Sequence, residues 1–317
     1  MAYSKIRVLM LCWEFPPMLT GGLGPACYGL AKALASFTDL KIVLPRSDLN
    51  FKMKKVNILG LNHFDFDGNT NELVLPDFKW FLADEYITPE IEERPAEVRL
   101  PYSNTEVSGH ELKSLFNDED SYGPNIMRKV QAYADAAERL TDLIEFDVIH
   151  AHDWITYPAG IRLKKKTGKP LLVHVHSLET DRAHPEARNQ TYNIEKEGMM
   201  AADRVLPVSE YTKHSIIDYY DIDPAKIFPV YNAVETTTVF REERTDNEKH
   251  ILFLGRITRQ KGPKFLFETM TKLCRQMSNV KFYIAGTGDQ SDTLRHEIEQ
   301  AGISEHAVFT GFVKKDK

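Results

Sequence analysis

Two adjoining stretches decide the fold: the apolar run IRVLMLCW at residues 6–13 and the glycine-rich turn TGGLGP at residues 20–25. A near-continuous apolar run is typical of a parallel strand that is buried on both faces. After the turn, apolar residues recur at spacings of three and four from Ala26 to Phe37, with Pro25 suited to a first helical turn. A strand, a tight turn and a helix in this order predict an α/β fold built on a parallel sheet.

The same alternation continues along most of the chain. It fades into an aperiodic insertion at residues 65–123 and into a polar linker at 232–247. We therefore expect two doubly wound domains, residues 1–240 and 248–317, the second having too few helices to cover both faces of its sheet. The expected strands cover residues 6–13, 41–44, 147–150, 170–176, 204–208, 250–255, 280–285 and 307–313. The expected helices cover residues 26–37, 126–144, 193–202, 264–275 and 292–301, with one more ending near Leu163 and another beginning at Glu210.

Length and composition agree with this organisation. The 317 residues are about twice the ~150 of a typical domain. The net charge of −6, with no basic block, argues against a nucleic-acid partner. Cys12, Cys27 and Cys274 are interpreted as buried thiols of a reducing compartment. No apolar run is long enough for a secretion signal or a transmembrane segment, so a cytoplasmic location is predicted.

Glycines and cations follow the strands at places where an open α/β sheet binds ligands. Gly21 and Gly22 would let a ligand approach the backbone, and the N–H groups of the next helix would stabilise an anion; a turn that needs positive φ is the alternative. Arg256 and Lys261 flank a strand-to-helix junction and suit a diphosphate, unless they are merely solvated surface cations. Gly286 and Thr287 follow the next strand and would admit a nucleoside.

Two histidine pairs each end a strand. In His150-Ala151-His152 and in His174-Val175-His176 alternate residues share a face, so each pair can point into one crevice. Neutral imidazole is a common zinc ligand, which leaves a metal site as one interpretation. The other interpretation is that these histidines belong to the sheet and that Asp153 only caps the following helix.

Taken together, these motifs resemble the retaining glycosyltransferases of the two-domain GT-B fold, in particular bacterial glycogen and starch synthases and their sucrose-phosphate-synthase-like relatives. The motifs run in family order over almost the whole chain. They are EFPP (14–17) with TGGLG (20–24), HAHDW (150–154), HVHSLE (174–179), VSEYT (208–212), NAV (232–234) and GRITRQKG (255–262).

The resemblance implies two Rossmann-like domains facing a cleft, in which glucose is transferred from ADP- or UDP-glucose with retention of configuration. It implies no catalytic metal and no cofactor. By position, His176 matches a residue that contacts the transferred sugar, and Asp153 an acidic residue beside it. Arg256 and Lys261 match the pair that holds the diphosphate. Gly21 and Gly22 match the loop whose backbone faces the reaction centre.

The acceptor implied is an α-glucan, as in glycogen biosynthesis, with a small sugar or a lipid as the alternative. Leu19 stands where glycogen synthases commonly have lysine, which favours a broader GT4-like assignment over the ADP-glucose subtype. The family's later pair of glutamates would lie beyond Lys317, so we expect a C-terminally truncated chain that is inactive by itself. A sugar- or glucan-binding protein without turnover and a metal-dependent hydrolase using the histidine pairs are the competing hypotheses.

Overall fold

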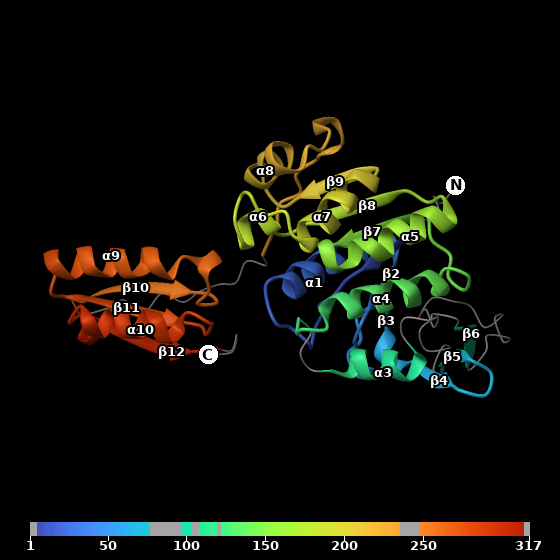
Figure 1. Ribbon diagram of the computed structural model, residues 1–317, viewed down its shortest axis with the longest axis horizontal. Helices are drawn as coiled ribbons and strands as arrows, with labels where there is room; N and C mark the ends of the chain where they lie inside the picture. Colours follow the sequence, from blue (N-terminus) through green and yellow to red (C-terminus); the bar gives the residue numbers. More distant parts are fainter. Residues whose placement is uncertain (1–4, 77–96, 103–107, 119–121, 235–246, 314–317) are drawn as a thin grey trace. The chain divides into compact units, whose positions relative to one another are not determined.

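A computed structural model describes residues 5–76, 97–102, 108–118, 122–234 and 247–313. The chain divides into two compact units, residues 1–180 with 184–235, and residues 181–183 with 236–317. Each unit is built on a parallel β-sheet with helices packed on it, as Figure 1 shows. The α/β class predicted from the alternation of strands and helices is confirmed.

The first unit contains a six-stranded parallel sheet in the order β3-β2-β1-β7-β8-β9. The chain runs outward from β1 in one direction and then in the other, so the order reverses next to β1, where doubly wound sheets bind ligands. The strands are β1 (Ile6–Leu11), β2 (Thr38–Leu44), β3 (Val56–Gly60), β7 (Val148–His152), β8 (Leu171–Val175) and β9 (Arg204–Pro207).

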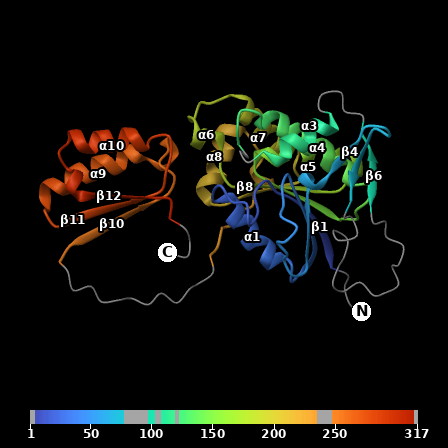
Figure 2. The same ribbon diagram turned by 90° about the horizontal axis from the view of Figure 1, so that it is seen from below.

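Helices cover both faces of this sheet, as the apolar run of β1 requires. Met10 and Cys12 belong to one hydrophobic cluster with α1. Leu9 and Leu11 belong to another, with α4, α5 and α7. Figure 2 shows α1 on the side of the sheet opposite α4 and α5. The helices are α1 (Leu23–Leu34), α4 (Ile126–Leu140), α5 (Tyr157–Thr167), the short α6 (Glu179–Arg182), α7 (Gln190–Ala201) and α8 (Glu210–Tyr220).

The expected insertion at 65–123 is more ordered than its sequence indicates. Its described residues form a small antiparallel sheet of β4 (Asp65–Asp67), β5 (Glu72–Leu75) and β6 (Val98–Pro101), together with α3 (Gly109–Asn117). The strands of this small sheet, of three or four residues each, are too short to show a period. The sequence analysis also missed the five-residue β3. Residues 77–96, 103–107 and 119–121 of the insertion, and 235–246 of the linker, lie outside the described part.

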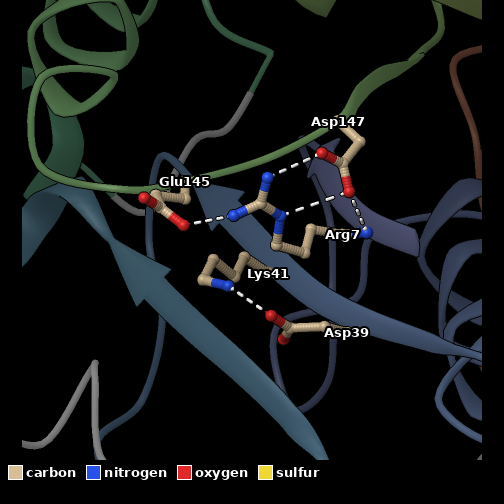
Figure 3. Close-up of polar contacts among 5 residues, drawn as sticks. All are labelled: Arg7, Asp39, Lys41, Glu145 and Asp147. Atoms are coloured by element: carbon tan, nitrogen blue, oxygen red, sulfur yellow. Dashed lines mark hydrogen bonds and ion pairs between the residues drawn. The ribbon is translucent and has the colours of Figure 1, made fainter. Parts of the chain in front are cut away.

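Ion pairs join the amino ends of β1 and β7, as Figure 3 shows. The Arg7 guanidinium donates to both carboxylate oxygens of Asp147, at 2.7 and 3.2 Å, and it also contacts Glu145. The backbone N–H of Arg7 adds a bond of 2.9 Å to Asp147. These hydrogen bonds lower the pKa of Asp147 to about 2. Because they lie at the amino ends of the strands, they leave the carboxyl edge open for chemistry.

The second unit has a three-stranded parallel sheet, β10-β11-β12, with α9 and α10 packed on the same face (Figure 2). On the other face Leu252 and Leu254 of β10 are 64% and 73% exposed. Cys274 is only half-buried, so the expectation of three buried thiols holds for Cys12 and Cys27 alone. The elements are β10 (Lys249–Leu254), α9 (Pro263–Gln276), β11 (Val280–Ala285), α10 (Ser291–Gln300) and β12 (Ala307–Gly311).

No helix within the described residues is both long enough and apolar enough to cross a lipid bilayer.

The packing of α7 on α5 gives a test of the first unit. A Cβ at Gly198 would lie 2.3 Å from the ring of buried Tyr157, so we expect Gly198→Ala to destabilise this unit by about 1–3 kcal/mol through overpacking. Gly29, exposed in α1, has no atom near its missing Cβ, so Gly29→Ala is expected to stabilise by about 0.5–1 kcal/mol. Urea unfolding followed by tryptophan fluorescence measures both, since all three tryptophans lie within residues 1–180. Equal effects of the two substitutions would contradict this packing.

Candidate active site

The glycine turn at the carboxyl end of β1 is held by a buried carboxylate. Glu14, which is 4% exposed, accepts hydrogen bonds from the backbone N–H groups of Thr20 and Gly21, both at 3.1 Å. Its other carboxylate oxygen accepts from the Thr20 hydroxyl at 2.7 Å and from the Tyr122 hydroxyl. The conformation of the turn is therefore set by an internal anion. The sequence analysis quoted Glu14 in a motif but gave it no role.

Gly21 and Gly22 are not needed for the shape of the turn. Neither has a positive φ, and a Cβ would meet nothing closer than 3.9 Å at Gly21 and nothing within 4 Å at Gly22. The alternative that the turn needs glycines for positive φ is therefore wrong. Gly24 differs, because a Cβ there would lie 2.3 Å from Leu19. Bare backbone at positions 21 and 22 is thus available to a ligand.

The start of α1 partly matches the expected anion site. Two N–H groups of the turn, at Thr20 and Gly21, are already occupied by Glu14. Gly22 is the N-cap of the helix and supplies no side-chain hydrogen bond. Among the described residues, the N–H groups of Gly22, Leu23 and Gly24 have no acceptor. What remains for an anion is therefore the first turn of the helix itself.

The two histidine pairs form one stack at the carboxyl ends of β7 and β8. In the parallel register His152 lies opposite His174, so the four rings share one face of the sheet. The ring of His174 lies 5.5 Å from that of His150 and 4.6 Å from that of His176. Two contacts link the strands: His152 Nδ1 to His176 Nε2 at 3.0 Å and His174 Nδ1 to His150 Nε2 at 3.3 Å. The predicted convergence of each pair is confirmed.

Burial keeps these imidazoles neutral. It lowers the pKa of His150 and of His174 to about 3, with the neighbouring imidazoles adding to the effect. Burial alone lowers the pKa of His176 to about 4, and the pKa of His152 is also lowered. His176 is the most exposed of the four, and among the described residues its Nδ1 has no partner. At neutral pH it therefore offers a ligand a neutral imidazole nitrogen.

The stack also contains two groups of possible metal ligands. They are His150, His152 and His174, and Cys27, His152 and His176, each with ligand atoms within 4.8 Å of one another. The Nε2 atoms of His152 and His174 are buried without a hydrogen-bond partner. In the first group the ring plane of His152 is inclined by 44° to that of His150 and by 23° to that of His174. In the second group the ring planes of His152 and His176 are inclined by 32°. Both groups keep the metal-site interpretation open.

Asp153 positions the loop that carries His176. Its Oδ1 accepts the backbone N–H groups of His176 at 3.1 Å and Ser177 at 3.3 Å, and its own N–H donates to the carbonyl of His174 at 2.9 Å. Its side chain makes no capping hydrogen bond, so the helix-cap alternative is wrong. The backbone of Asp153 has φ 63°, a conformation that costs about 1–3 kcal/mol and is concentrated at functional sites.

In the second unit the loops that follow β10 and β11 are joined at the carboxyl edge. Ile257 donates to the carbonyl of Thr287 at 3.0 Å, and Gln290 donates to the carbonyl of Ile257 at the same distance. Arg256 and Lys261 are exposed and form no ion pair with any residue that the structure describes. A Cβ at Gly255 would lie 3.9 Å from Lys261, which places the lysine stem beside the end of β10. The sheet thus brings the predicted cations and the Gly286-Thr287 turn to one edge.

The glycines of the second turn have a structural role. A Cβ at Gly286, where φ is 142°, would lie 1.9 Å from the carbonyl oxygen of Gly255. A Cβ at Gly288 would lie 2.2 Å from the carbonyl oxygen of Ile257. Both glycines allow the two loops to approach, so their presence alone does not indicate a ligand. Thr287 takes part in the same loop packing, because its carbonyl oxygen accepts the hydrogen bond from the Ile257 N–H.

Comparison with known proteins identifies the family. Residues 7–225 match the family described as starch synthase catalytic domain, and residues 235–317 match glycosyl transferases group 1. The chain belongs to the starch synthase catalytic domain family. It is therefore a glycosyltransferase of the GT4/GT5 type with the GT-B fold.

The relatives of this glycosyltransferase are distant. An uncharacterised glycosyltransferase of Methanocaldococcus jannaschii is 26% identical over 98% of the chain and 70% of its own length. A glycogen synthase of Mycobacterium tuberculosis is 23% identical over 96% of the chain and 67% of its own length. The solved sucrose-phosphate synthase of Thermosynechococcus elongatus aligns with a TM-score of 0.64 at 14% identity, over 98% of this chain and 71% of that one.

The histidine stack predicts acid sensitivity of the first unit. In the unfolded chain these imidazoles titrate near pH 6.5, whereas in the folded protein they stay neutral to about pH 4 or below. The unfolded state therefore binds more protons below pH 6.5, and the free energy of unfolding falls there by about 1.4 kcal/mol per pH unit for each such histidine.

Urea unfolding by tryptophan fluorescence between about pH 5 and 7 measures this slope. We expect His150→Gln to reduce this pH dependence by the contribution of one histidine, about 1.4 kcal/mol per pH unit. His214→Gln, at an exposed position of α8, is the control and should leave the slope unchanged. A stability that does not vary from pH 7 to pH 5 would contradict the buried neutral stack.

Proposed function

We propose that this glycosyltransferase transfers glucose, with retention of configuration, from ADP- or UDP-glucose to a carbohydrate acceptor. The α-glucan expected from the sequence and a small sugar are the two acceptor classes. One observation supports the proposal most directly: Arg256 and Lys261 lie beside the carboxyl edge of the second unit's sheet without ion-pair partners among the described residues. Two uncompensated cations at this edge suit the diphosphate of a nucleotide sugar.

The proposed glucosyl transfer creates negative charge on the leaving diphosphate, which fixed cations stabilise. The bond between the anomeric carbon and the phosphate oxygen breaks, and its electrons leave with the diphosphate. An acceptor hydroxyl then bonds to the carbon and gives its proton to the departing phosphate oxygen. Arg256 and Lys261 stabilise the charge that grows on the leaving group, so the proposed reaction needs no transition metal and no cofactor. Gly286 and Thr287 are the proposed contacts of the nucleoside.

The proposal also gives roles to residues of the first unit. The backbone of Gly21 and Gly22 faces the sugar phosphate. His176, neutral at pH 7, contacts the transferred sugar through its ring Nδ1. Asp153 acts through the loop that it holds rather than as a free carboxylate. In this proposal residues 1–240 form the catalytic and acceptor-binding domain and 248–317 the domain that binds the nucleotide sugar.

The diphosphate role is testable by calorimetry with ADP and UDP. We expect Arg256→Ala and Lys261→Ala each to weaken nucleotide binding about tenfold or more, because each removes a charge-assisted hydrogen bond. Lys272→Ala, at an exposed position of α9, is the matched control and should leave the affinity unchanged. Wild-type affinity in both of the first two variants would rule out the proposed role.

Turnover itself is tested by radiolabelled transfer from a panel of nucleotide sugars to glycogen and to small sugars, with and without a chelator. We expect transfer from ADP- or UDP-glucose that chelation leaves unchanged. Binding of nucleotide sugar without any product would favour the alternative of a sugar-binding protein. Stoichiometric zinc together with activity lost on chelation would favour the metal-dependent hydrolase.

A further inference from the structure

A pocket of about 260 Å³ opens in the first unit beside the glycine turn. Its wall comes from three places in the chain: the segment between β1 and α1, the carboxyl end of β2, and the region of α3 and α4. The lining residues are Trp13, Pro17, Met18, Leu19, Thr20, Pro45, Arg46, Leu115, Phe116, Asp118 and Lys129.

The pocket is lined by two cationic side chains and one carboxylate. Lys129, whose side chain is 3% exposed, forms an ion pair of 2.9 Å with Asp118. Arg46 is half-buried and forms neither a hydrogen bond nor an ion pair with any residue in the described ranges. Among the described lining residues, Arg46 is thus the cation for which the structure shows no counter-ion. A guanidinium presents paired N–H donors that match a phosphate or a carboxylate.

The remaining wall suits a sugar ring. Trp13, Leu115 and Phe116 supply apolar surface, against which the carbon-bound hydrogens of a sugar can pack. The volume lies just below the ~300–1,000 Å³ range of pockets for drug-sized ligands, so one substituted ring fits better than a polymer segment. A neutral glucan would leave Arg46 without a counter-charge.

The pocket lies next to the proposed reaction centre. Leu19 and Thr20 line it, and they directly precede the bare backbone of Gly21 and Gly22. Glu14 fixes Thr20 from the other side, so this wall is preorganised. An occupant of the pocket therefore lies beside the turn at which the transferred sugar is proposed to react.

We propose that this pocket is the acceptor subsite and that the acceptor is a single anionic sugar, phosphorylated or carboxylated, whose anion binds Arg46. This inference rests on the proposed function and narrows it, because it selects a small charged acceptor over an α-glucan. Arg46 is assigned as the residue that determines acceptor specificity.

Calorimetry with the whole chain tests the subsite without turnover. The probes are glucose 6-phosphate, glucuronate, glucose and maltotriose, each titrated alone. We expect one or both anionic sugars to bind and the neutral ones to bind at least tenfold more weakly; the two anionic probes show whether phosphate or carboxylate is preferred. Arg46→Gln should weaken anionic binding tenfold or more. Arg46→Lys, which keeps the charge but loses the paired donors, should give an intermediate affinity.

Arg204→Gln is the control, since Arg204 lies at the amino end of β9. The unfolding midpoint from tryptophan fluorescence shows that each variant is folded, and the affinity for UDP or ADP should be unchanged in all of them. Equal binding of neutral and anionic sugars, or anionic binding that both Arg46 substitutions leave intact, would overturn the inference.

The outcomes separate this inference from the proposed function. If Arg46→Gln transfers glucose to glycogen with an unchanged KM for glycogen, the proposed glucosyl transfer is supported and the anionic acceptor is refuted. Binding of an anionic sugar that requires Arg46, without transfer from any nucleotide sugar, would support the subsite and refute the proposed function.

Discussion

The parallel pairing of β1 with β2 on one side and β7 on the other is the constraint on which the first unit depends. Parallel strands all end at one edge, so residues that follow different strands are brought together there. The turn after β1, the end of β2 with Arg46 and the histidines of β7 and β8 all lie at this edge. The Arg7–Asp147 ion pair joins the same strands at their amino ends, where no site residue lies. The ion pair and the candidate site residues thus lie at opposite edges of one sheet.

Two buried carboxylates preorganise the loops at this edge. Glu14 holds the glycine turn through backbone N–H groups, and Asp153 holds the loop of His176 in the same way. A carboxylate that accepts backbone hydrogen bonds fixes a loop without closing it to ligands. The space that a Cβ would take is open at Gly21 and Gly22, whereas at Gly286 and Gly288 it is filled by the packing of the two loops.

Burial determines the protonation state of the histidine stack. Four adjacent imidazoles would repel one another if protonated, and their depressed pKa values keep them uncharged. His176, the most exposed of the four rings, is therefore a neutral group that can hydrogen-bond a polar ligand.

The sequence by itself determined the α/β class, the long buried strands, the glycine turn and the shared face of the histidine pairs, because these depend on periods of 2 and 3.6 and on residues next to one another in the chain. It missed β3, and it missed the small sheet of β4, β5 and β6, whose strands are too short to show a period. Only the tertiary structure decided that Glu14 binds the turn, that Asp153 positions His176 and that Arg46 lies in a pocket with Phe116. These contacts join residues far apart in sequence or depend on loop conformation, and no local pattern encodes them. Leu115, Phe116 and Lys129 lie on or beside α3 and α4, and only the folding of that segment against the carboxyl ends of β1 and β2 turns them into the wall of a site.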